Sequence, residues 1–386
     1  MDRFDAVVVG AGPAGSLTAY HLARGGASVL LLDRAKFPRD KPCGGGLTGR
    51  ALGHLPFSVD PVVEHVVDRF EFRFRHRRGF VRRGRGPLVL MTQRRRLDAY
   101  LAERAAEAGA DFRDGTKVTG VEMGADGATV IVSGRRVEGR VVIGADGANG
   151  ITARSLGLGC GYRRGVAFEG NCAYGDVDGQ RFTGRALVDL GVTAGGYGWV
   201  FPKGDHANVG IGGWEEEGPV LRSRLSELCE AHRIPPDRLS DLRGHRLPLR
   251  RGDGAARGRA LLVGDAAGLV DPISGDGLYE AFASARLAAD AVLRLLGGSA
   301  RDLSGYDAAL SRALDSQASA SWAAKTALER FPRATFGLLR VPPVWPVLEA
   351  LLRGEIEHPA EAQGVARPPL RLIRMLGNAR VLALGR

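Results

Sequence analysis

A glycine turn near the N-terminus constrains the fold of this chain more than any other feature. Residues 6–9 form an apolar run typical of a buried strand, and the apolar periodicity of residues 13–24 predicts a helix. The turn between them, residues 10–15, reads Gly-Ala-Gly-Pro-Ala-Gly, which allows a tight turn and a close backbone approach to a pyrophosphate. A second strand, residues 28–32, ends at Asp33, where a carboxylate can bind an adenosine ribose. The pattern predicts the first βαβ unit of a doubly wound, dinucleotide-binding sheet.

Two later segments return to the same kind of fold. Buried-strand patterns at residues 141–143 and 259–263 lead into Gly144-Ala-Asp146-Gly147 and Gly264-Asp265, and a helix is predicted over residues 278–296. With 386 residues, the chain is long enough for two or three compact units. We therefore expect a cofactor-binding unit that is assembled from separate segments of the chain.

The intervening segments have the patterns of a second sheet and of a helical tail. Residues 66–90 alternate: Phe70, Phe72 and Phe74 share one face, and Glu71, Arg73 and Arg75 share the other, which we expect to be a solvated strand face. Residues 166–250 contain short strand patterns and glycine turns, and residues from about 305 onward have a helical pattern that is broken by Pro332, Pro342, Pro343 and Pro346.

These patterns predict an α/β protein with three parts. The first is a Rossmann-like cofactor-binding domain formed by residues 1–65, 91–165 and 251–304. The second is an inserted, mainly antiparallel β-sheet substrate domain formed by residues 66–90 and 166–250, and the third is a C-terminal helical region, residues 305–386.

Charge and composition limit the classes of partner. The formal net charge is +11, but only five of the 54 basic residues are lysine, a skew that fits arginine-favouring codon usage, and no nucleic-acid motif accompanies it. We therefore expect no nucleic-acid partner; a basic face toward anionic lipid or a diphosphate is the alternative use of this charge.

The cysteines and the apolar stretches indicate the compartment. The four cysteines, Cys43, Cys160, Cys172 and Cys229, lack paired or metal-ligand spacing, so we expect reduced thiols and no metal site. No apolar stretch is long enough to span a bilayer, and the first residues lack a signal-peptide layout. We expect a cytoplasmic location, with peripheral contact at the inner face of the membrane as the second option.

Taken together, the three glycine loops resemble the three-part signature of FAD enzymes of the hydroxylase-like flavoprotein class. Arg94, in Arg-x-x-Leu-Asp98, resembles the arginine that contacts FAD phosphate in this class, although a solvated helix-start arginine would look the same. Asp265 offers a carboxylate to a sugar hydroxyl or, alternatively, caps a helix. The stretch from Gly264 to Gly277 ends in Gly-Asp-Gly at a predicted helix start, which can bind an anion.

Two further motifs resemble the geranylgeranyl reductase family. One is Phe37-Pro-Arg-Asp-Lys-Pro-Cys43-Gly-Gly-Gly46, similar to the cysteine-glycine loop beside the flavin, and the other is Tyr197-Gly-Trp199-Val-Phe201-Pro202, similar to the family's Tyr-x-Trp-x-Phe-Pro signature. The resemblance covers residues 5 to about 300. One position departs from it: Ala194 stands where the family usually has a proline, which leaves the exact substrate open.

The resemblance and the loop patterns together imply a set of site residues. Contacts with FAD are expected at Gly10, Gly12, Pro13, Ala14, Gly15, Asp33, Arg34, Cys43, Gly44, Gly46, Arg94, Val118, Asp146, Gly264, Asp265, Pro272, Gly275, Gly277 and Leu278. Tyr197, Trp199 and Phe201 alternate along a strand, so they share one face that would bind an isoprenoid chain; a plain sheet-core row is the alternative. Cys43, Tyr197 and Trp199 are the catalytic candidates, with Cys43 shaping or protonating the site.

The family resemblance implies an FAD-dependent reductase that saturates carbon–carbon double bonds of a prenyl chain on a lipid, a diphosphate or a quinone. Reduced flavin would supply hydride while an acid protonates the other carbon, with NADPH, NADH or reduced ferredoxin as a transient electron donor. The alternatives are an FAD-dependent hydroxylase or halogenase that acts on a hydrophobic molecule, and a non-enzymatic FAD-binding or lipid-carrier protein. We expect a monomer or weak homo-oligomer whose C-terminal region covers a lipid tunnel, rests on a membrane or simply packs on the core.

Overall fold

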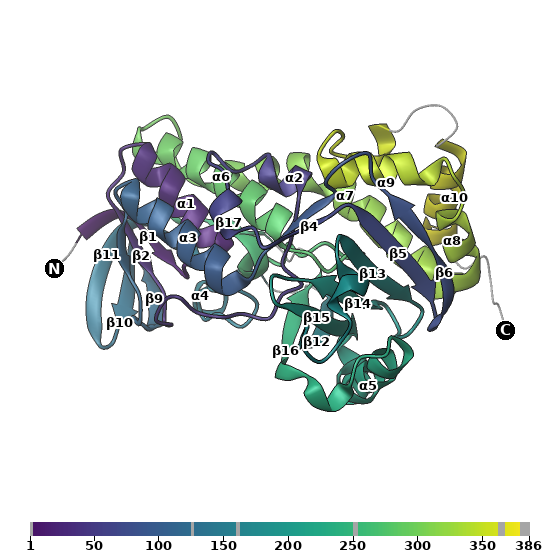
Figure 1. The fold of residues 1–386 in the computed structure, drawn as a ribbon. Coiled ribbons are helices and arrows are strands. Elements are labelled where there is room, and N and C mark those ends of the chain that lie inside the picture. Colours follow the sequence, from purple (N-terminus) through teal and green to yellow (C-terminus); the bar gives the residue numbers. More distant parts are fainter. Residues whose placement is uncertain (1–2, 125–126, 160–162, 250–253, 362–366, 379–386) are drawn as a thin grey trace.

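The computed structural model describes residues 3–124, 127–159, 163–249, 254–361 and 367–378. The fold contains an eight-stranded sheet, a seven-stranded sheet and a small three-stranded sheet, with helices packed around them (Figure 1). The prediction of an α/β fold with a Rossmann-like parallel sheet, an antiparallel sheet and C-terminal helices is confirmed.

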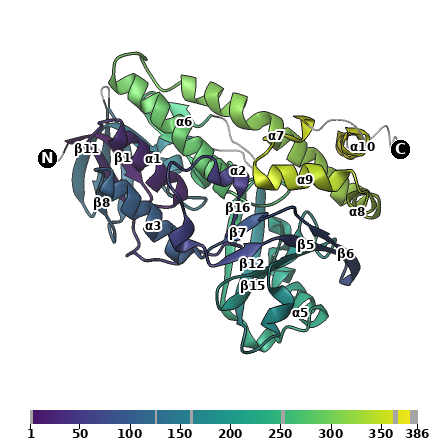
Figure 2. The ribbon, with the colours of Figure 1, turned by 45° about the horizontal axis from the view of Figure 1, so that its top comes forward.

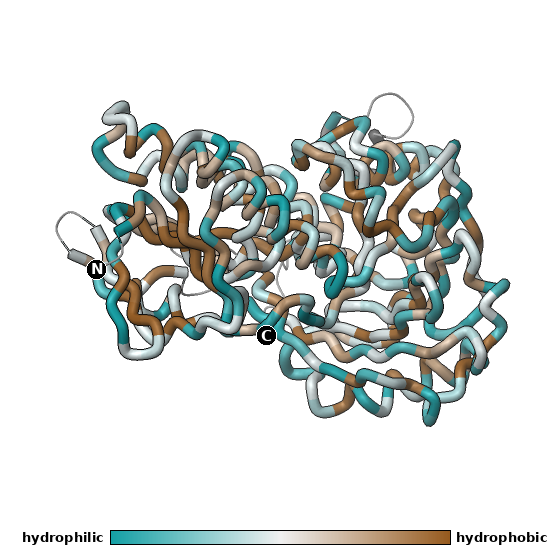
Figure 3. Tube along the Cα trace, turned by 60° about the vertical axis from the view of Figure 1, so that its left-hand side comes forward, coloured by the Kyte–Doolittle hydropathy of each residue, from teal (hydrophilic) through white to brown (hydrophobic). Residues whose placement is uncertain are grey.

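The eight-stranded sheet forms the core of the nucleotide-binding fold. Its strands are β1 (Arg3–Val9), β2 (Val29–Leu32), β8 (Asp111–Arg113), β9 (Val118–Met123), β10 (Ala128–Val132), β11 (Arg135–Gly144), β17 (Ala256–Arg257) and β18 (Ala260–Leu262). Strands β18, β11, β1, β2 and β8 run parallel to one another in this order, so segments that are far apart in sequence end at one edge. Figure 3 shows the buried strands as a group of brown, hydrophobic tubes.

Three helices pack against one another beside this sheet. They are α1 (Pro13–Arg24), α3 (Arg94–Glu107) and α6 (Leu278–Leu296), and α1 contacts both of the others. The short helices α2 (Gly49–Leu52) and α4 (Thr152–Leu156) lie on the connecting segments. The first predicted βαβ unit is thus observed, with the helix bounds at residues 13 and 24 as expected.

The seven-stranded sheet forms the second body of the molecule. Its order is β16 (Ser240–Pro248), β12 (Arg164–Ala173), β15 (His206–Trp214), β14 (Tyr197–Pro202), β13 (Arg185–Leu190), β5 (Arg69–Phe74) and β6 (Arg77–Arg83), and all neighbours are antiparallel except β13 and β5. Helix α5 (Leu221–Ala231) packs on one face through a cluster that includes Leu187, Leu225 and Leu228. The opposite face points toward the rest of the molecule (Figure 1).

A three-stranded sheet connects the two bodies. It consists of β3 (Gly46–Thr48), β7 (Val89–Met91) and β4 (His65–Val67), which pair antiparallel around β7. The C-terminal helices α7 (Gly305–Arg330), α8 (Pro332–Leu339), α9 (Val344–Arg353) and α10 (Arg367–Asn378) lie along one side of the molecule, and α7 packs on α6 (Figure 2). The breaks between α7, α8 and α9 fall at Pro332, which begins α8, and at Pro343, which precedes α9, whereas Pro346 was expected to break the pattern and lies inside the first turn of α9.

One expectation about the sheet is wrong. The face of β5 that carries Glu71 is not solvated: Glu71 is only 7% exposed, and its carboxylate pairs with Arg73 at 2.6 Å and with Arg185 at 3.1 Å. The reason is tertiary, because β13 aligns beside β5 and supplies Arg185 as a partner charge. Arg75 lies outside the strand, in the turn to β6. Cys172 and Cys229 are buried free thiols, as expected, whereas Cys160 lies outside the described residues.

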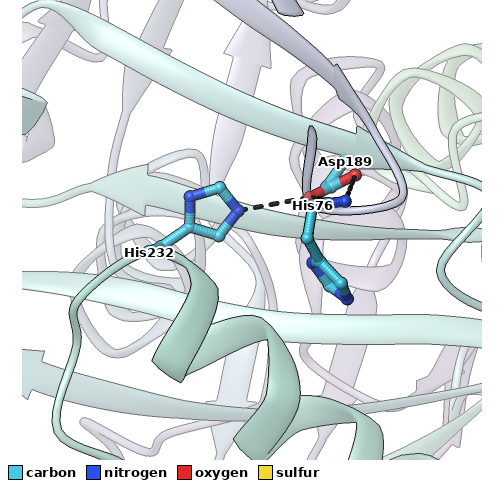
Figure 4. A group of neighbouring side chains, drawn as sticks. All are labelled: His76, Asp189 and His232. Atoms are coloured by element: carbon cyan, nitrogen blue, oxygen red, sulfur yellow. Dashed lines mark hydrogen bonds and ion pairs between the residues drawn. The ribbon is translucent and has the colours of Figure 1, made fainter. Parts of the chain in front are cut away.

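A buried His-Asp-His cluster holds the turn between β5 and β6 (Figure 4). Both turn residues, Arg75 and His76, have positive φ values (51° and 61°), a conformation that costs free energy for residues with a side chain. Asp189 on β13 offsets this cost, because it accepts hydrogen bonds from the His76 amide at 3.1 Å and lies 3.1 Å from His76 Nδ1. The Nε2 atom of His232 approaches the same carboxylate at 3.3 Å. One atom of each side chain could bind a metal ion, and these three atoms lie within 4.8 Å of one another. The hydrogen bonds described above are enough to explain the cluster as a contact that stabilises the turn.

We predict that Asp189→Asn lowers the free energy of unfolding by about 2–3 kcal/mol, because a buried carboxylate that faces three nitrogen groups, two of His76 and one of His232, is lost. Chemical denaturation followed by circular dichroism measures this change. The matched control is Asp205→Asn, which alters an exposed Asp–His pair at 2.7 Å and should change the free energy by less than about 1 kcal/mol. Equal losses in the free energy of unfolding for the two substitutions would contradict a stabilising role of Asp189 at the turn.

Candidate functional site

The three glycine loops meet at the edge where β1, β11 and β18 end. Their packing is tight: a Cβ atom on Gly10 would lie 2.4 Å from the Ala145 carbonyl oxygen, and one on Gly15 would lie 1.8 Å from the Gly10 carbonyl oxygen. Gly12 differs, because the nearest atom to its Cβ position is a guanidinium nitrogen of Arg39, at 3.5 Å. Gly10 and Gly15 therefore hold strand, loop and helix together, and Gly12 leaves an open approach to the backbone at the start of α1.

A cavity of about 1580 Å³ extends from this edge to the C-terminal helices. This volume exceeds the range of about 300–1,000 Å³ that is usual for a single small ligand. The predicted cofactor residues line it, except Gly15 and Gly264, which are packed against other backbone and against Ala14. The predicted substrate residues Tyr197, Trp199 and Phe201 line the same cavity.

Two arginines share one buried carboxylate beside Gly12. Arg94, at the start of α3, donates to both oxygens of Asp98 at 2.6 and 2.8 Å, and Arg39 reaches the same carboxylate at 2.9 Å. Burial opposes the charge of Arg94, but Asp98 raises its pKa above the ordinary value. The alternative of a solvated arginine is wrong, because Arg94 is 6% exposed. Arg39 also lies 3.8 Å from Asp33, so the two arginines face two carboxylates; what they offer a phosphate next to Gly12 is their N–H donors.

Two carboxylates of the loops have different surroundings. Asp33 accepts from the Ala11 amide at 2.8 Å, which closes the first loop onto the end of β2. Asp265 pairs with Lys41 at 3.1 Å, and although burial raises its pKa, the ammonium group holds that pKa below the ordinary value. The observed partner of the Asp265 side chain is therefore a lysine rather than a helix end.

Asp146 has a structural role that the loop pattern did not indicate. Its Oδ2 accepts from the Ile151 amide at 2.7 Å and from the amide and hydroxyl of Thr152 at 2.9 and 2.8 Å. Its contribution to cofactor binding therefore remains a proposal, carried by its position at the cavity wall.

The aromatic row and the cysteine loop pack against each other. Tyr197, Trp199 and Phe201 share the cavity face of β14, with ring centroids 6.0 and 6.2 Å apart in succession. A Cβ atom on Gly44 would lie 2.9 Å from the Phe201 ring, and the Cys43 thiol accepts from the Gly45 amide at 3.3 Å. The structure thus brings the catalytic candidates Cys43 and Trp199 to one part of the cavity.

Polar residues behind the cysteine loop were missed by sequence reasoning. Glu169 on β12 accepts from the Cys43 amide at 2.6 Å, and Asn208 on β15 accepts from Trp199 Nε1 at 2.8 Å. Lys203, just after β14, is 2% exposed and donates to the carbonyl oxygens of Gly44 and of Thr92, the latter at 2.7 Å. Burial lowers the pKa of Lys203. A signal was present for Lys203, because it is one of only five lysines in an arginine-rich chain and it directly follows the aromatic motif.

Two further titratable groups face the cavity. Burial, with Lys41 nearby, lowers the pKa of His245 to about 4, so this imidazole is neutral at pH 7. Asp276 accepts from the Leu278 amide at 3.0 Å at the start of α6, and burial raises its pKa to about 6. Both residues were also missed: His245 has no motif around it, and Asp276 was read only as part of a glycine turn.

The residues at the glycine edge fit FAD. The open backbone at Gly12 and the paired arginines suit a pyrophosphate, Asp33 lies where an adenosine ribose would bind, and the start of α6 lies beside the Cys43 loop in the same cavity. The size of the cavity leaves room for a second, apolar ligand beside the aromatic row. The fold and the site thus define an FAD-dependent oxidoreductase.

Comparison with known proteins identifies the family. Residues 3–171 match the family model of an FAD binding domain. The chain is 34% identical over 311 residues to a geranylgeranyl diphosphate reductase of Rhodobacter capsulatus, with 76% of each chain covered. It is 33% identical over 318 residues to a menaquinone reductase of Mycolicibacterium smegmatis, with 75% of this chain and 76% of the relative covered. The chain belongs to the geranylgeranyl reductase family.

A solved structure shares the whole fold. It is a geranylgeranyl bacteriochlorophyll reductase-like protein from Thermoplasma acidophilum, which superposes with a TM-score of 0.80 at 23% identity and covers 97% of this chain and 96% of that one. The predictions of FAD as cofactor and of an FAD-dependent oxidoreductase are confirmed.

We predict that Gly12→Ala weakens FAD binding at least about tenfold, equivalent to about 1.4 kcal/mol, without destabilising the apoprotein. The φ of Gly12 is −75°, which any residue adopts, so the added methyl group should interfere with the cofactor rather than with folding. Fluorescence titration of apoprotein with FAD measures the affinity, and thermal unfolding measures the stability.

The contrasting variant is Gly15→Ala, whose Cβ would collide with backbone and should destabilise the apoprotein itself. If Gly12→Ala bound FAD as tightly as the wild type, the FAD pyrophosphate would not lie against Gly12.

Proposed function

We propose that this protein saturates isolated carbon–carbon double bonds in the prenyl chain of a lipid, a diphosphate or a quinone. The observation that carries the proposal is the continuous cavity, which joins the FAD-binding edge to an aromatic row and then to an apolar passage between the C-terminal helices. The two relatives are named for reduction of geranylgeranyl and menaquinone compounds, which share a prenyl chain and differ in the head group.

The cavity wall has the chemistry that a prenyl chain requires. Among the C-terminal helices it is lined by apolar side chains of α7, α8 and α9, including Leu328, Leu339, Leu348 and Leu352. Polar side chains of α7, among them Lys325 and Glu329, also line it. The apolar side chains bind a long hydrocarbon through burial of apolar surface, at about 25 cal/mol per Å². We propose that the C-terminal helices cover a lipid passage rather than only packing on the core.

Several groups would orient and stabilise the reacting partners. Reduced FAD supplies hydride when bound. The N-terminus of α6 offers a positive dipole end to an anion in the cavity, and Trp199 offers its ring face to positive charge that develops on the alkene. Tyr197 donates its hydroxyl to the Ser274 carbonyl oxygen, so it holds the aromatic row against the loop before α6. Burial raises the pKa of Tyr197, which keeps this hydroxyl protonated.

We predict that anaerobic incubation of the dithionite-reduced holoenzyme with a panel of geranylgeranyl lipids, geranylgeranyl diphosphate and menaquinones adds two hydrogens per reduced bond to one substrate class. Mass spectrometry of the extracted lipids measures the gain, and dithionite makes the result independent of the natural electron donor. A hydroxylase or halogenase would need oxygen and would add none of these hydrogens. Absence of any gain across the panel would contradict the proposal.

We also propose a peripheral contact of α10 with anionic lipid. On this helix Leu372 and Met375 are 44% and 67% exposed, and Arg371 and Arg374 lie at the wall of the cavity. Exposed apolar side chains beside arginines are the pattern of a helix that lies in a membrane interface. Among the described residues, no helix is both long and apolar enough to cross a bilayer.

The double substitution Leu372→Asp/Met375→Asp should reduce cosedimentation with phosphatidylglycerol vesicles at least about tenfold, because two apolar contacts are replaced by charges that anionic lipid repels. The control is Val220→Asp/Leu242→Asp, which changes exposed apolar residues elsewhere on the surface and should leave cosedimentation unchanged. Equal cosedimentation of both variants with the vesicles would contradict a contact between α10 and lipid.

A further inference from the structure

The carboxyl group of Glu169 is buried, and one of its two oxygens accepts no hydrogen bond from the described residues. Glu169 lies on β12, is 5% exposed, and forms part of the cavity wall. Its Oε1 accepts from the Cys43 amide at 2.6 Å and from Asn208 Nδ2 at 3.4 Å, whereas its Oε2 is buried and has no hydrogen-bond partner among the described residues. A buried carboxylate with one unpartnered oxygen is costly unless that oxygen carries a proton or meets a ligand.

Glu169 lies close to each of the groups that define the reaction site. Cys43 is its hydrogen-bond partner, and Asn208 connects it to Trp199, whose Nε1 donates to Asn208 Oδ1 at 2.8 Å. The carboxyl group therefore adjoins both the cysteine loop and the aromatic row.

We propose that Glu169 is the acid that delivers the proton to the substrate double bond, an inference that rests on the proposed function. One alkene carbon takes the proton from Glu169 and the other takes hydride, with its electron pair, from the reduced flavin. The π bond is lost, two C–H bonds form, the flavin is oxidised and Glu169 is left as a carboxylate that solvent reprotonates between turnovers. An isolated alkene has no carbonyl to activate it, so its reduction by hydride also needs a proton donor within reach of the second carbon.

The surroundings of Glu169 keep the acid form available. Burial raises its pKa above the ordinary glutamate value, Asp40 adds to this effect, and the Cys43 amide, Lys203 and Asn208 oppose it. The charged and titratable groups around it are Lys203 after β14, Cys43 and Asp40 on the loop, and Arg243 on β16, which pairs with Asp40 at 3.0 Å. The acid is active when protonated, so the rate should fall as pH rises through the raised pKa of Glu169.

Asp276 is the rival carboxyl donor; Cys43, the other candidate for protonating the site, is a thiol. Asp276 also lines the cavity and has a raised pKa, of about 6, but its Oδ1 already accepts from the Leu278 amide at 3.0 Å at the start of α6. Glu169 differs because its free oxygen is buried beside Cys43 and Asn208, which connects to Trp199. Each candidate therefore needs its own amide variant in the test.

The test compares Glu169→Gln with two other amide variants, Asp276→Asn and Glu349→Gln. The glutamine keeps an acceptor for the Cys43 amide and removes the acid; Glu349 is a buried carboxyl on α9 that accepts from the Arg85 amide at 2.6 Å, so it is the matched control. Glu169→Gln should bind FAD and unfold like the wild type, yet reduce prenyl lipids at least about 100-fold more slowly and without the wild-type loss of rate at high pH.

A second readout needs neither cofactor nor turnover. Infrared spectra of the apoprotein near neutral pH should show a protonated-carboxyl stretch that is lost in Glu169→Gln and kept in Glu349→Gln. Wild-type rates in Glu169→Gln, or a 100-fold loss in Asp276→Asn alone, would overturn the assignment of Glu169. If the wild type reduces no prenyl compound, the proposed function fails instead, and the infrared result then decides the protonation state of Glu169 independently.

Discussion

The buried ammonium group of Lys203 is the contact on which the geometry of the site depends. It follows β14 of the seven-stranded sheet and donates to the carbonyl oxygens of Gly44 and Thr92, which belong to the cysteine loop and to the end of β7. A Cβ atom on Gly45 would lie 2.0 Å from the Thr92 carbonyl oxygen, and the φ of Gly45 is +69°, so the close approach of the loop requires glycine here. This contact fixes the cysteine loop of the nucleotide-binding fold against the aromatic row of the substrate sheet, and one cavity results.

The same junction explains how one fold performs two tasks. The parallel strands end in loops whose open backbone fits a dinucleotide, with Arg39 and Arg94 beside it, while we propose that the antiparallel sheet presents side chains of alternate residues to a second ligand. The C-terminal helices close the far end of the cavity with leucine side chains. The proposed alkene reduction depends on this arrangement of the two sheets around one cavity.

Local sequence patterns were sufficient for the features that depend on backbone. The GxGxxG loop, the helix from Pro13 to Arg24 and the alternation of Tyr197, Trp199 and Phe201 follow from short-range rules, and the structure contains each of them. The exposure of Glu71 was predicted wrongly because its partner Arg185 lies on a strand that is remote in sequence. Glu169 and Asn208 escaped notice for the same reason, since their partners Cys43 and Trp199 lie on other segments of the chain, whereas Lys203 had a signal in the sequence that was not used.

The proposed reaction requires that flavin and prenyl chain share this cavity and that hydride passes directly between them. Anaerobic stopped-flow absorbance of the reduced holoenzyme tests it, with an unsaturated geranylgeranyl lipid in one syringe and its fully saturated analogue in a parallel run. The account predicts that the oxidised flavin spectrum returns only with the unsaturated chain, at a rate that matches product formation. If the flavin stayed reduced with both lipids, or was oxidised only after oxygen was admitted, direct hydride transfer to the prenyl chain would be contradicted.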